Sequence, residues 1–265
     1  MKQQMITEVL TKEQLVRSLR ELGVRNGMVL EVQSSRKSFG YVVGGAQTVV
    51  DALMDAVGYE GTIVMPLQSG DNTEPSCWCR PPIDRRLFHT IREHTPAFDP
   101  RMSDTRKMGR VVENFRRRQG VYFSYHPSSA FVAYGKYAKL ICSEHSLHYS
   151  LSNESPLGQL WKLQAYVLLL GVDYTNCTGM HLGEYRSGVR PIVLQGGSVE
   201  TESGQKWVEY LDLELDSDEF MEPGRRLERK GFVNTCTIGN ATCKLFPLRP
   251  AVDQTVVYLQ QKYGN

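Results

Sequence analysis

Residues 27–33 read Gly-Met-Val-Leu-Glu-Val-Gln and residues 61–66 read Gly-Thr-Ile-Val-Met-Pro, and both segments are short and apolar, as buried strands are. Between them, Gly44-Gly45-Ala46 precedes a segment whose apolar residues share one helical face, namely Val49, Val50, Leu53 and Val57. A strand, a helix and a strand in this order predict that the two strands pair in parallel. We expect Pro66 to close the second strand.

The flanking segments extend this α/β pattern. Thr11 is placed to cap a helix over residues 11–22, with Gln14 in the capping-box position. Further helices are expected over 84–94, 108–118, 134–142 and 157–162, further strands over 120–124 and 166–171, and short antiparallel segments over 192–194, 205–212 and 233–238. The sequence therefore predicts a single domain over residues 1–265, with a mixed, partly parallel sheet flanked by helices and an antiparallel C-terminal portion.

The composition is that of an ordinary globular protein, because 41% of the 265 residues are hydrophobic and 23% are charged. The longest apolar runs, residues 165–172 and 62–67, are too short to span a membrane. The first residues lack the apolar core of a signal peptide, so we expect a cytoplasmic protein with no membrane partner. The formal net charge of +2 decides nothing about nucleic acid, but no nucleic-acid-binding module is recognisable, so we expect no such partner.

One local run of positive charge stands out. Arg116-Arg117-Arg118 follows Arg106, Lys107 and Arg110 along the chain. The run has no interleaved aromatic residues of the kind that nucleic-acid surfaces use. We interpret it as a solvated helix face or as a contact for a small phosphorylated ligand.

The six cysteines do not form a recognisable metal or redox motif. They stand at positions 77, 79, 142, 177, 236 and 243, and no two have the C-x-x-C spacing of a structural zinc site. We expect mostly free, buried thiols. A nucleophilic role for Cys177 stays open, since nothing in the sequence shows whether its pKa is lowered.

The strongest candidate for chemistry is a histidine three residues ahead of a carboxylate. Residues 175–185 read Thr-Asn-Cys-Thr-Gly-Met-His-Leu-Gly-Glu-Tyr and follow the apolar run at 165–171. Residues i and i+3 of a helix share a face, so His181 and Glu184 can form one acid–base unit at the carboxyl end of a strand. A carboxylate fixes the tautomer of a histidine and strengthens it as a base. The alternative is a histidine with only a structural role at the start of a helix.

Two further segments have the character of ligand-binding loops. Residues 39–48, Phe-Gly-Tyr-Val-Val-Gly-Gly-Ala-Gln-Thr, resemble a glycine-rich turn that presents helix N–H groups to a phosphate, although such glycines also serve close helix–strand packing. Residues 34–38, Ser-Ser-Arg-Lys-Ser, follow the first strand and offer hydroxyls and cations to an extended polar ligand. A solvated loop is the alternative for this second segment.

Eight motifs follow one another in a consistent order along the chain. They are Val32-Gln-Ser-Ser35, Val43-Gly-Gly-Ala46, Gly61-Thr-Ile-Val-Met-Pro66, Met108-Gly109 with Phe115-Arg116, His126-Pro-Ser-Ser-Ala-Phe131 with Gly135, Glu154-Ser-Pro-Leu-Gly158, Leu168-Leu-Leu-Gly171, and Thr178 with His181-Leu-Gly-Glu184. Together they resemble the aminoglycoside 3-N-acetyltransferase family. The resemblance spans roughly residues 10–185, and the C-terminal third matches more loosely.

Two positions depart from the pattern that this family often shows. The first strand is commonly followed by His-Ser-Ser, and this chain has Gln33-Ser34-Ser35. The second loop commonly reads Ser-Phe-Ala, and here it reads Ser129-Ala130-Phe131. Neither change touches His181 or Glu184, but both bear on how the thiol end of the cofactor or the acceptor is held.

The resemblance implies a reaction and a site. It implies an α/β fold unrelated to the GNAT acetyltransferases, and acetyl transfer from acetyl-CoA to the 3-amino group of a 2-deoxystreptamine aminoglycoside, conferring antibiotic resistance, with no metal. By position, His181 would be the general base, and Glu184 would orient it or bind the acceptor. Thr178 and the amides near Ser35 would stabilise the oxyanion. The CoA path would be lined by Ser34, Ser35, Lys37, Gly44, Gly45, Ala46, Thr105, Met108, Gly109, Thr178 and, for the phosphates, Arg116.

An acidic run bears separately on the acceptor. Asp212, Glu214, Asp216, Asp218, Glu219 and Glu222 follow closely on Glu209. A surface of one charge sign concentrates ligands of the other, which suits a polycationic amine, although a solvated acidic face is equally common. We expect Asp216 and Glu219 to contact the acceptor and Tyr149 to stack on a sugar. For the oligomeric state, a homodimer is our hypothesis.

Three rival functions remain open at this point. The same fold can acetylate a different amine, a hydrolase can use His181 and Glu184 to activate water, and a non-catalytic protein can bind CoA without turnover.

Overall fold

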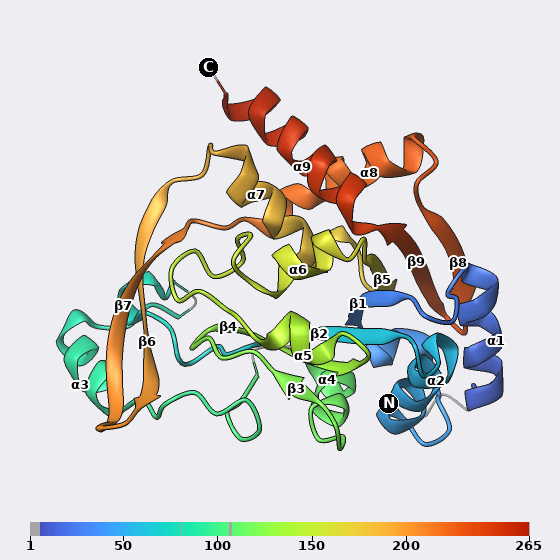
Figure 1. Cartoon of the computed structure of the whole chain (residues 1–265), viewed down its shortest axis with the longest axis horizontal. Helices are drawn as coiled ribbons and strands as arrows, with labels where there is room; N and C mark the ends of the chain where they lie inside the picture. The colour runs from blue at the N-terminus through green and yellow to red at the C-terminus, as the bar shows by residue number, and fades with distance from the viewer. Residues whose placement is uncertain (1–5, 80, 106–107, 265) are drawn as a thin grey trace.

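A seven-stranded mixed sheet forms the centre of the computed structural model, which describes residues 6–79, 81–105 and 108–264 (Figure 1). From one edge to the other its strands are β3 (Tyr122–Phe123), β4 (Ser129–Gly135), β2 (Thr62–Gln68), β1 (Val29–Ser34), β5 (Tyr166–Leu170), β9 (Ala241–Pro247) and β8 (Asn234–Ile238). β1 pairs in parallel with β2 on one side and with β5 on the other. The remaining pairings in this sheet are antiparallel. The predicted strand–helix–strand unit and the mixed sheet are therefore confirmed.

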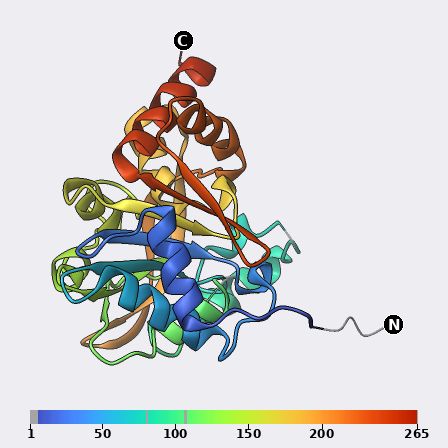
Figure 2. The ribbon, with the colours of Figure 1, turned by 90° about the vertical axis from the view of Figure 1, so that its right-hand side faces the viewer.

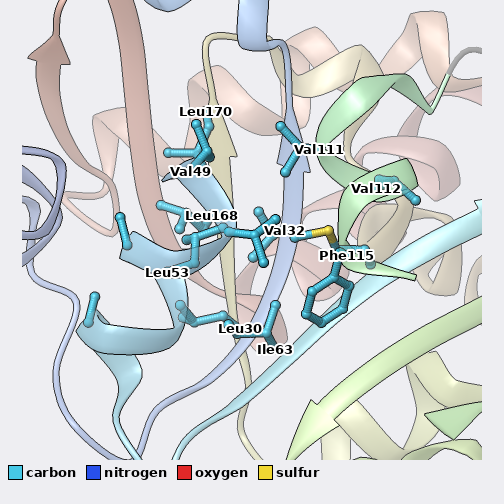
Figure 3. Packing of buried hydrophobic residues seen from close by; sticks show 14 of the residues in the cluster. Leu30, Val32, Val49, Leu53, Ile63, Val111, Val112, Phe115, Leu168 and Leu170 are labelled. Atoms are coloured by element: carbon cyan, nitrogen blue, oxygen red, sulfur yellow. The ribbon is translucent and has the colours of Figure 1, made fainter. Parts of the chain in front are cut away.

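Helices cover both faces of the sheet because its central strands are apolar on both sides. One face packs against α1 (Lys12–Leu22), α2 (Ala46–Val57) and α4 (Gly109–Phe115), and the other against α5 (Ala138–Cys142), α6 (Pro156–Lys162), α7 (His181–Ser187), α8 (Met221–Arg229) and α9 (Leu248–Tyr263). Leu30 and Val32 of β1 lie against Val49 and Leu53 of α2 in the first layer (Figure 3). In the turned view, α1 lies toward the viewer, below α8 and α9 (Figure 2).

A long two-stranded ribbon leaves the body of the molecule. β6 (Ile192–Thr201) and β7 (Gly204–Leu213) pair along their whole length and form the arm at the left of Figure 1. The short helix α3 (Phe88–His94) lies beside its far end, where Gln205 donates to the Thr95 carbonyl at 2.5 Å. The antiparallel character predicted after Arg190 is confirmed, with longer strands than the sequence indicated.

Local sequence signals fix the first helix. Thr11 caps α1 and forms the predicted capping box with Gln14, in which each side chain bonds the other's backbone N–H. Gly23 ends the helix with φ 118°, a left-handed conformation that glycine adopts without steric cost. An N-cap such as Thr11 contributes about 1 kcal/mol to the free energy of unfolding.

Several predicted boundaries were wrong for identifiable reasons. Pro66 does not close β2, which runs on to Gln68. The pairing of β2 with β1 ends at Val64. The edge of β2 that faces β1 therefore forms no backbone hydrogen bonds at Pro66, and the missing N–H of the proline disrupts none. The helix predicted from residue 134 begins only at Ala138, because Tyr134 and Gly135 still pair with β2. The helix predicted over 108–118 ends at Phe115.

Short 3₁₀ segments connect the larger elements. They are η1 (Arg36–Phe39), η2 (Pro75–Cys77), η3 (Arg85–Leu87), η4 (Tyr174–Asn176), η5 (Thr178–Met180) and η6 (Ser217–Phe220). Within the part of the chain that the structure describes, none of the helices has both the length and the apolar character that crossing a membrane requires.

Candidate active site

The candidate residues meet because β1 and β5 are parallel and end at the same edge of the sheet. Ser34, the last residue of β1, pairs with Leu170, the last residue of β5, and Ser35 N–H donates to the Leu170 carbonyl at 2.9 Å. From β5 the chain passes through η4 and η5 directly into α7, whose first residue is His181. Two segments far apart in sequence therefore deliver Ser34 and His181 to one place, as carboxyl edges of parallel strands do.

His181 and Glu184 form the pair that their spacing predicted. His181 Nδ1 lies 2.5 Å from Glu184 Oε2, and the Glu184 side chain is completely buried. If Nδ1 donates this hydrogen bond, Nε2 is the nitrogen that can accept a proton. The imidazole is 12% exposed and packs edge-on against Phe220 at 4.9 Å between ring centroids. The ring is thus held on two sides while its edge remains accessible.

Glu184 is held as a carboxylate by three donors. In addition to His181, the Arg190 Nε and the Asp216 N–H donate to Oε1, at 2.7 Å and 3.0 Å. Burial acts to raise the pKa of Glu184, but the hydrogen bonds from His181 and Asp216 and the charge of Arg190 outweigh it, so the pKa lies below its ordinary value. The carboxylate therefore stays ionised at neutral pH and can stabilise a positive charge on His181.

His181 lines a small cavity that adjoins a larger groove. The cavity, of about 260 Å³, is lined by residues that include Gln33, Ser34, Met108, Asn176, Thr178 and His181. The groove, of about 890 Å³, shares Ser34, Val172 and Asn176 with the cavity, so the two are continuous. Ser34 Oγ is buried where they meet and has no hydrogen-bond partner among the described residues. A ligand lying in the groove can therefore reach the cavity past Ser34.

Positive charge lines the groove. Arg36, Lys37, Arg110 and Lys244 all contribute to its wall, together with one carboxylate, Asp173. Lys244 is engaged by Glu228 at 2.5 Å. The other three cations form no ion pair with a described residue. A groove of this charge suits a phosphorylated ligand.

The predicted cofactor residues divide into two groups. Ser34, Ser35, Lys37 and Gly109 line the groove, and Ser34, Met108 and Thr178 line the cavity. The second group lies outside both linings and comprises Gly44, Gly45, Ala46, Thr105 and Arg116. Arg106 and Lys107 of the basic run lie outside the described residues.

The second group has structural roles in the described contacts. Gly44 and Gly45 have positive φ, and a Cβ on Gly44 would lie 2.3 Å from Thr48 Oγ1, so this turn serves the start of α2. Thr105 donates to Glu113 at 2.7 Å. Arg116 is only 4% exposed, and it bonds Glu113 and the carbonyls of residues 100 and 103. Its guanidinium is thus already satisfied by protein partners.

The structure places the residues expected at the acceptor, Asp216, Glu219 and Tyr149, in contact with other protein groups. Asp216 gives its backbone N–H to Glu184. Glu219 is paired with Arg190 at 3.0 Å and with Lys262 at 2.7 Å, so its charge is already neutralised. Tyr149 packs edge-on against Tyr185 at 6.5 Å and does not line the cavity. The acidic run therefore serves in part to hold Arg190 beside Glu184.

Cys177 does not have the character of a nucleophile. The side chain is 1% exposed and packs in the apolar layer beneath the site. Burial and the nearby Glu31 carboxyl raise the pKa of the thiol well above its ordinary value. A buried thiol of this kind stays protonated at neutral pH.

Sequence reasoning missed three residues at the site. Arg190 was noted only as the point where the strand pattern changes, and nothing in its neighbourhood shows that it reaches back six residues to Glu184. Gln33 was recognised only as a departure from a histidine, yet it lines the cavity. Glu31 was read as part of a strand, although a carboxylate inside an apolar strand is itself an unusual signal.

The fold and the site together define a class of protein. A basic groove that leads to a histidine–carboxylate pair at the carboxyl edge of an α/β sheet is suited to an enzyme that binds a phosphorylated co-substrate and transfers a proton. The sequence model of the family described as aminoglycoside 3-N-acetyltransferase matches residues 32–260. The chain therefore belongs to this family of acyltransferases.

Individual relatives agree with this assignment. The chain is 41% identical over 244 residues to the SPbeta prophage-derived aminoglycoside N(3')-acetyltransferase-like protein YokD of Bacillus subtilis, covering 92% of this chain and 90% of YokD. The YokD crystal structure superposes with a TM-score of 0.94, covering 98% of this chain and 97% of that one. Aminoglycoside N(3)-acetyltransferase VII of Streptomyces paromomycinus is 30% identical, with 96% and 93% covered.

A further solved structure carries a ligand. It is a histidine-to-alanine mutant of aminoglycoside acetyltransferase AAC(3)-IVa in complex with a gentamicin. It is 28% identical to this chain, with a TM-score of 0.80 and 97% and 91% of the two chains covered.

Proposed function

We propose that this protein transfers the acetyl group of acetyl-CoA to the 3-amino group of a 2-deoxystreptamine aminoglycoside, with His181 as the general base. The observation that carries the proposal is that His181, paired with the buried Glu184, lines a cavity that continues into a cationic groove. Membership of the aminoglycoside 3-N-acetyltransferase family supplies the substrate class.

The base is needed because an ammonium group is not a nucleophile. The ammonium first loses one proton to solvent to become the free amine, and with Nδ1 donating to Glu184, Nε2 of His181 takes the second proton from the nitrogen as it attacks. The amine nitrogen forms a bond to the acetyl carbon, and the bond from that carbon to the CoA sulfur breaks. The departing thiolate takes up a proton, and we assign that proton to the imidazolium of His181. Glu184 stabilises the imidazolium while it exists, in the way a buried carboxylate does in a catalytic triad.

The tetrahedral intermediate needs a donor for its oxyanion. Thr178 lines the same cavity as His181, and its Oγ1 accepts a hydrogen bond from Gln33 Nε2 at 2.8 Å. The hydroxyl proton of Thr178 is therefore available to another acceptor. One such donor contributes about 10²–10³ in kcat.

The groove has the charge that the CoA phosphates require. Arg36, Lys37 and Arg110 line it and are not engaged in ion pairs with described residues. We assign them to the phosphates, so that the pantetheine arm leads the thioester past Ser34 into the cavity. Charge-assisted hydrogen bonds of this kind are about twice as strong as neutral ones.

The acceptor is assigned by class. The family description specifies the 3-amino group, and a relative of the same fold has been crystallised with a gentamicin. Because the carboxylate of Glu219 is held by Arg190 and Lys262, the acidic contacts that orient a polycation are expected elsewhere on the cavity rim. We propose that the protein acts on the 3-amino group and confers resistance to drugs that carry it.

The test is a thiol-release assay with the purified protein, acetyl-CoA and a panel of aminoglycosides. The panel holds gentamicin, tobramycin and neomycin, together with one drug that lacks the 3-amino group. We expect thiol release only with the drugs that have this amine, and we expect His181→Ala to abolish it. A reaction without acceptor measures hydrolysis of acetyl-CoA.

Each result bears on the proposal. Release that requires the amine and His181 supports transfer by the proposed base. Release at the same rate without acceptor would make the protein a thioester hydrolase. Binding of CoA without release in the presence of any drug would move the activity to a different amine or to a non-catalytic role.

A further inference from the structure

A buried carboxyl group lies directly beneath the proposed site and has no part in the mechanism above. Glu31 stands in the middle of β1, the central parallel strand, and its side chain is completely buried. Its neighbours Leu30 and Val32 point into the layer of α2 (Figure 3), so the alternation of the strand directs Glu31 toward α7 and α9. An acidic residue in this position is costly unless it has a role.

The contacts of Glu31 lead to the turn that carries the catalytic residues. Glu31 Oε1 accepts the Gly179 N–H at 2.9 Å and an N–H of Gln33 at 3.2 Å. Oε2 has no partner among the described residues, and a Cβ on Gly179 would lie only 2.2 Å from it. Gly179 is the middle residue of η5 (Thr178–Met180), the turn that directly precedes His181. Glu31 therefore fixes this turn from below.

Glu31 also determines which end of the Gln33 amide faces Thr178. Gln33 Nε2 donates one hydrogen to Glu31 Oε1 and the other to Thr178 Oγ1, at 2.8 Å. If the amide were reversed, its oxygen would face Glu31 Oε1, which already accepts from Gly179, and two acceptors would meet. With the amide held this way round, Thr178 accepts from Gln33. Its own proton is then left for a ligand in the cavity.

Without Glu31, hydrogen bonding no longer favours one orientation of the Gln33 amide over the other. A reversed amide would accept the hydroxyl proton of Thr178, which would then be lost to the oxyanion. Burial raises the pKa of Glu31 to about 7, so the neutral form, which keeps Oε1 as an acceptor, persists up to neutral pH. Glutamine at position 31 reproduces that neutral form in shape and in its acceptor oxygen.

We propose that Glu31 is a positioning residue for acetyl transfer, which orients the amide of Gln33 so that the hydroxyl of Thr178 donates to the oxyanion in the cavity. The inference rests on the proposed function, because it assigns a role within that reaction. Glu31 itself touches neither substrate.

The experiment is a double-mutant cycle on the full-length protein, with kcat, the KM for acetyl-CoA and Tm measured for each variant. Thr178→Val removes the donor and is expected to lower kcat by about 10²–10³. Glu31→Met keeps the volume but removes the acceptor, and we expect kcat to fall by about 10-fold or more, with less than about a three-fold change in KM. Glu31→Gln is the matched control, with kcat within about three-fold of the wild type.

The decisive comparison is the variant with both changes. If Glu31 acts through Thr178, adding Glu31→Met to Thr178→Val lowers kcat no further. Full additivity of the two losses, or equal losses in Glu31→Gln and Glu31→Met, would overturn the proposal and leave Glu31 a structural residue. If Glu31→Met does not fold, Gln33→Glu tests the same point, because a carboxylate there accepts the Thr178 proton. Unchanged kcat in Gln33→Glu would also overturn it.

The proposed function is tested separately in the same assay. Loss of turnover in Glu31→Met beside a fully active wild type and an inactive His181→Ala supports both. An active wild type with unaffected Glu31→Met leaves the reaction standing and removes the role of Glu31. A wild type with no transferase activity removes both.

Discussion

Two histidine sites in this molecule have opposite environments. His181 faces a cavity and bonds a buried carboxylate, whereas His126 and His145 stack on each other at 4.9 Å between ring centroids and bond no carboxylate among the described residues. His126 Nδ1 accepts the N–H groups of Ser128 and Ser129, at 3.2 Å and 3.1 Å. A histidine that can act as a base therefore differs from a structural histidine in its carboxylate partner and in its access to a cavity.

The buried pair is fixed in its neutral form. Because His126 Nδ1 is an acceptor, its Nε2 is the protonated nitrogen and donates to the Leu147 carbonyl at 3.1 Å. Burial lowers the pKa of His126 to about 4, and burial together with the neighbouring ring lowers the pKa of His145 to about 3. Neither ring has an acid–base role at neutral pH, although His126 belongs to one of the motifs that carry the family resemblance.

The largest expected effect comes from removing the charge beside His181. Glu184→Gln leaves a neutral amide where a carboxylate now stabilises the imidazolium, and it leaves Arg190 buried with one partner fewer. We expect kcat to fall by about 10²–10⁴, the range typical of general acid–base catalysis. Steady-state acetyl transfer measures it. A variant that keeps more than half of the wild-type kcat would show that the pair is not an acid–base unit.

The buried histidines predict a loss of stability in acid. Between the ordinary histidine pKa of 6.5 and the folded value of about 4, the unfolded chain binds a proton at His126 that the folded chain does not. Stability therefore falls as pH falls through this window, by about 3 kcal/mol for His126 alone. Urea unfolding at about pH 7 and about pH 5 measures the slope.

A variant isolates this effect. His126→Gln should be less stable than the wild type at neutral pH but should lose less stability on acidification. Replacing His89, an exposed residue, by alanine is the control and should leave the slope unchanged. If His126→Gln kept the wild-type slope, the acid sensitivity would belong to other groups.

Glu31 predicts the opposite sign. Its folded pKa of about 7 is raised above the ordinary 4.5, so the stability it contributes is complete below 4.5 and is lost as pH rises through 7. Above this window Glu31→Gln should be more stable than the wild type by up to about 3 kcal/mol, and the difference should vanish in acid. Unfolding of both proteins at about pH 5 and about pH 8 measures it. An equal difference at both pH values would contradict the assignment.

The smallest effect is expected in the groove. Each of Arg36→Ala, Lys37→Ala and Arg110→Ala should raise the KM for acetyl-CoA by about 3- to 10-fold with kcat nearly unchanged, because each removes one charge from a phosphate contact. Arg117→Ala is the control, since Arg117 lies on the surface beside Glu113 and outside the groove lining. Three variants with an unchanged KM would place the phosphates elsewhere.

Local and short-range features were predictable from the sequence. The capping box at Thr11, the parallel pairing of β1 with β2 and the contact of His181 with Glu184 all follow from spacing within about one turn or one supersecondary unit. The family resemblance, carried by the order of the motifs, added the expectation that Ser34 lines the CoA path and that His181 is the general base.

Long-range contacts were not predictable. The insertion of β9 between β5 and β8 depends on where the C-terminal chain returns, which no local pattern encodes. Arg116 reads as a surface cation, and only the fold shows that carbonyls of a distant loop surround its guanidinium. Glu219 was expected to contact the acceptor because it lies in an acidic run, and the partners that neutralise it, Arg190 and Lys262, come from other segments that the local sequence does not show.

The most direct test of the account measures turnover and Tm for His181→Ala and His126→Gln side by side. We predict that His181→Ala lowers kcat for acetyl transfer by a factor of about 10²–10⁴, while Tm stays within a few degrees of the wild type. We also predict that His126→Gln lowers Tm while the folded fraction keeps its turnover. The reverse pattern, with turnover lost in His126→Gln and kept in His181→Ala, would contradict the assignment of His181 as the base.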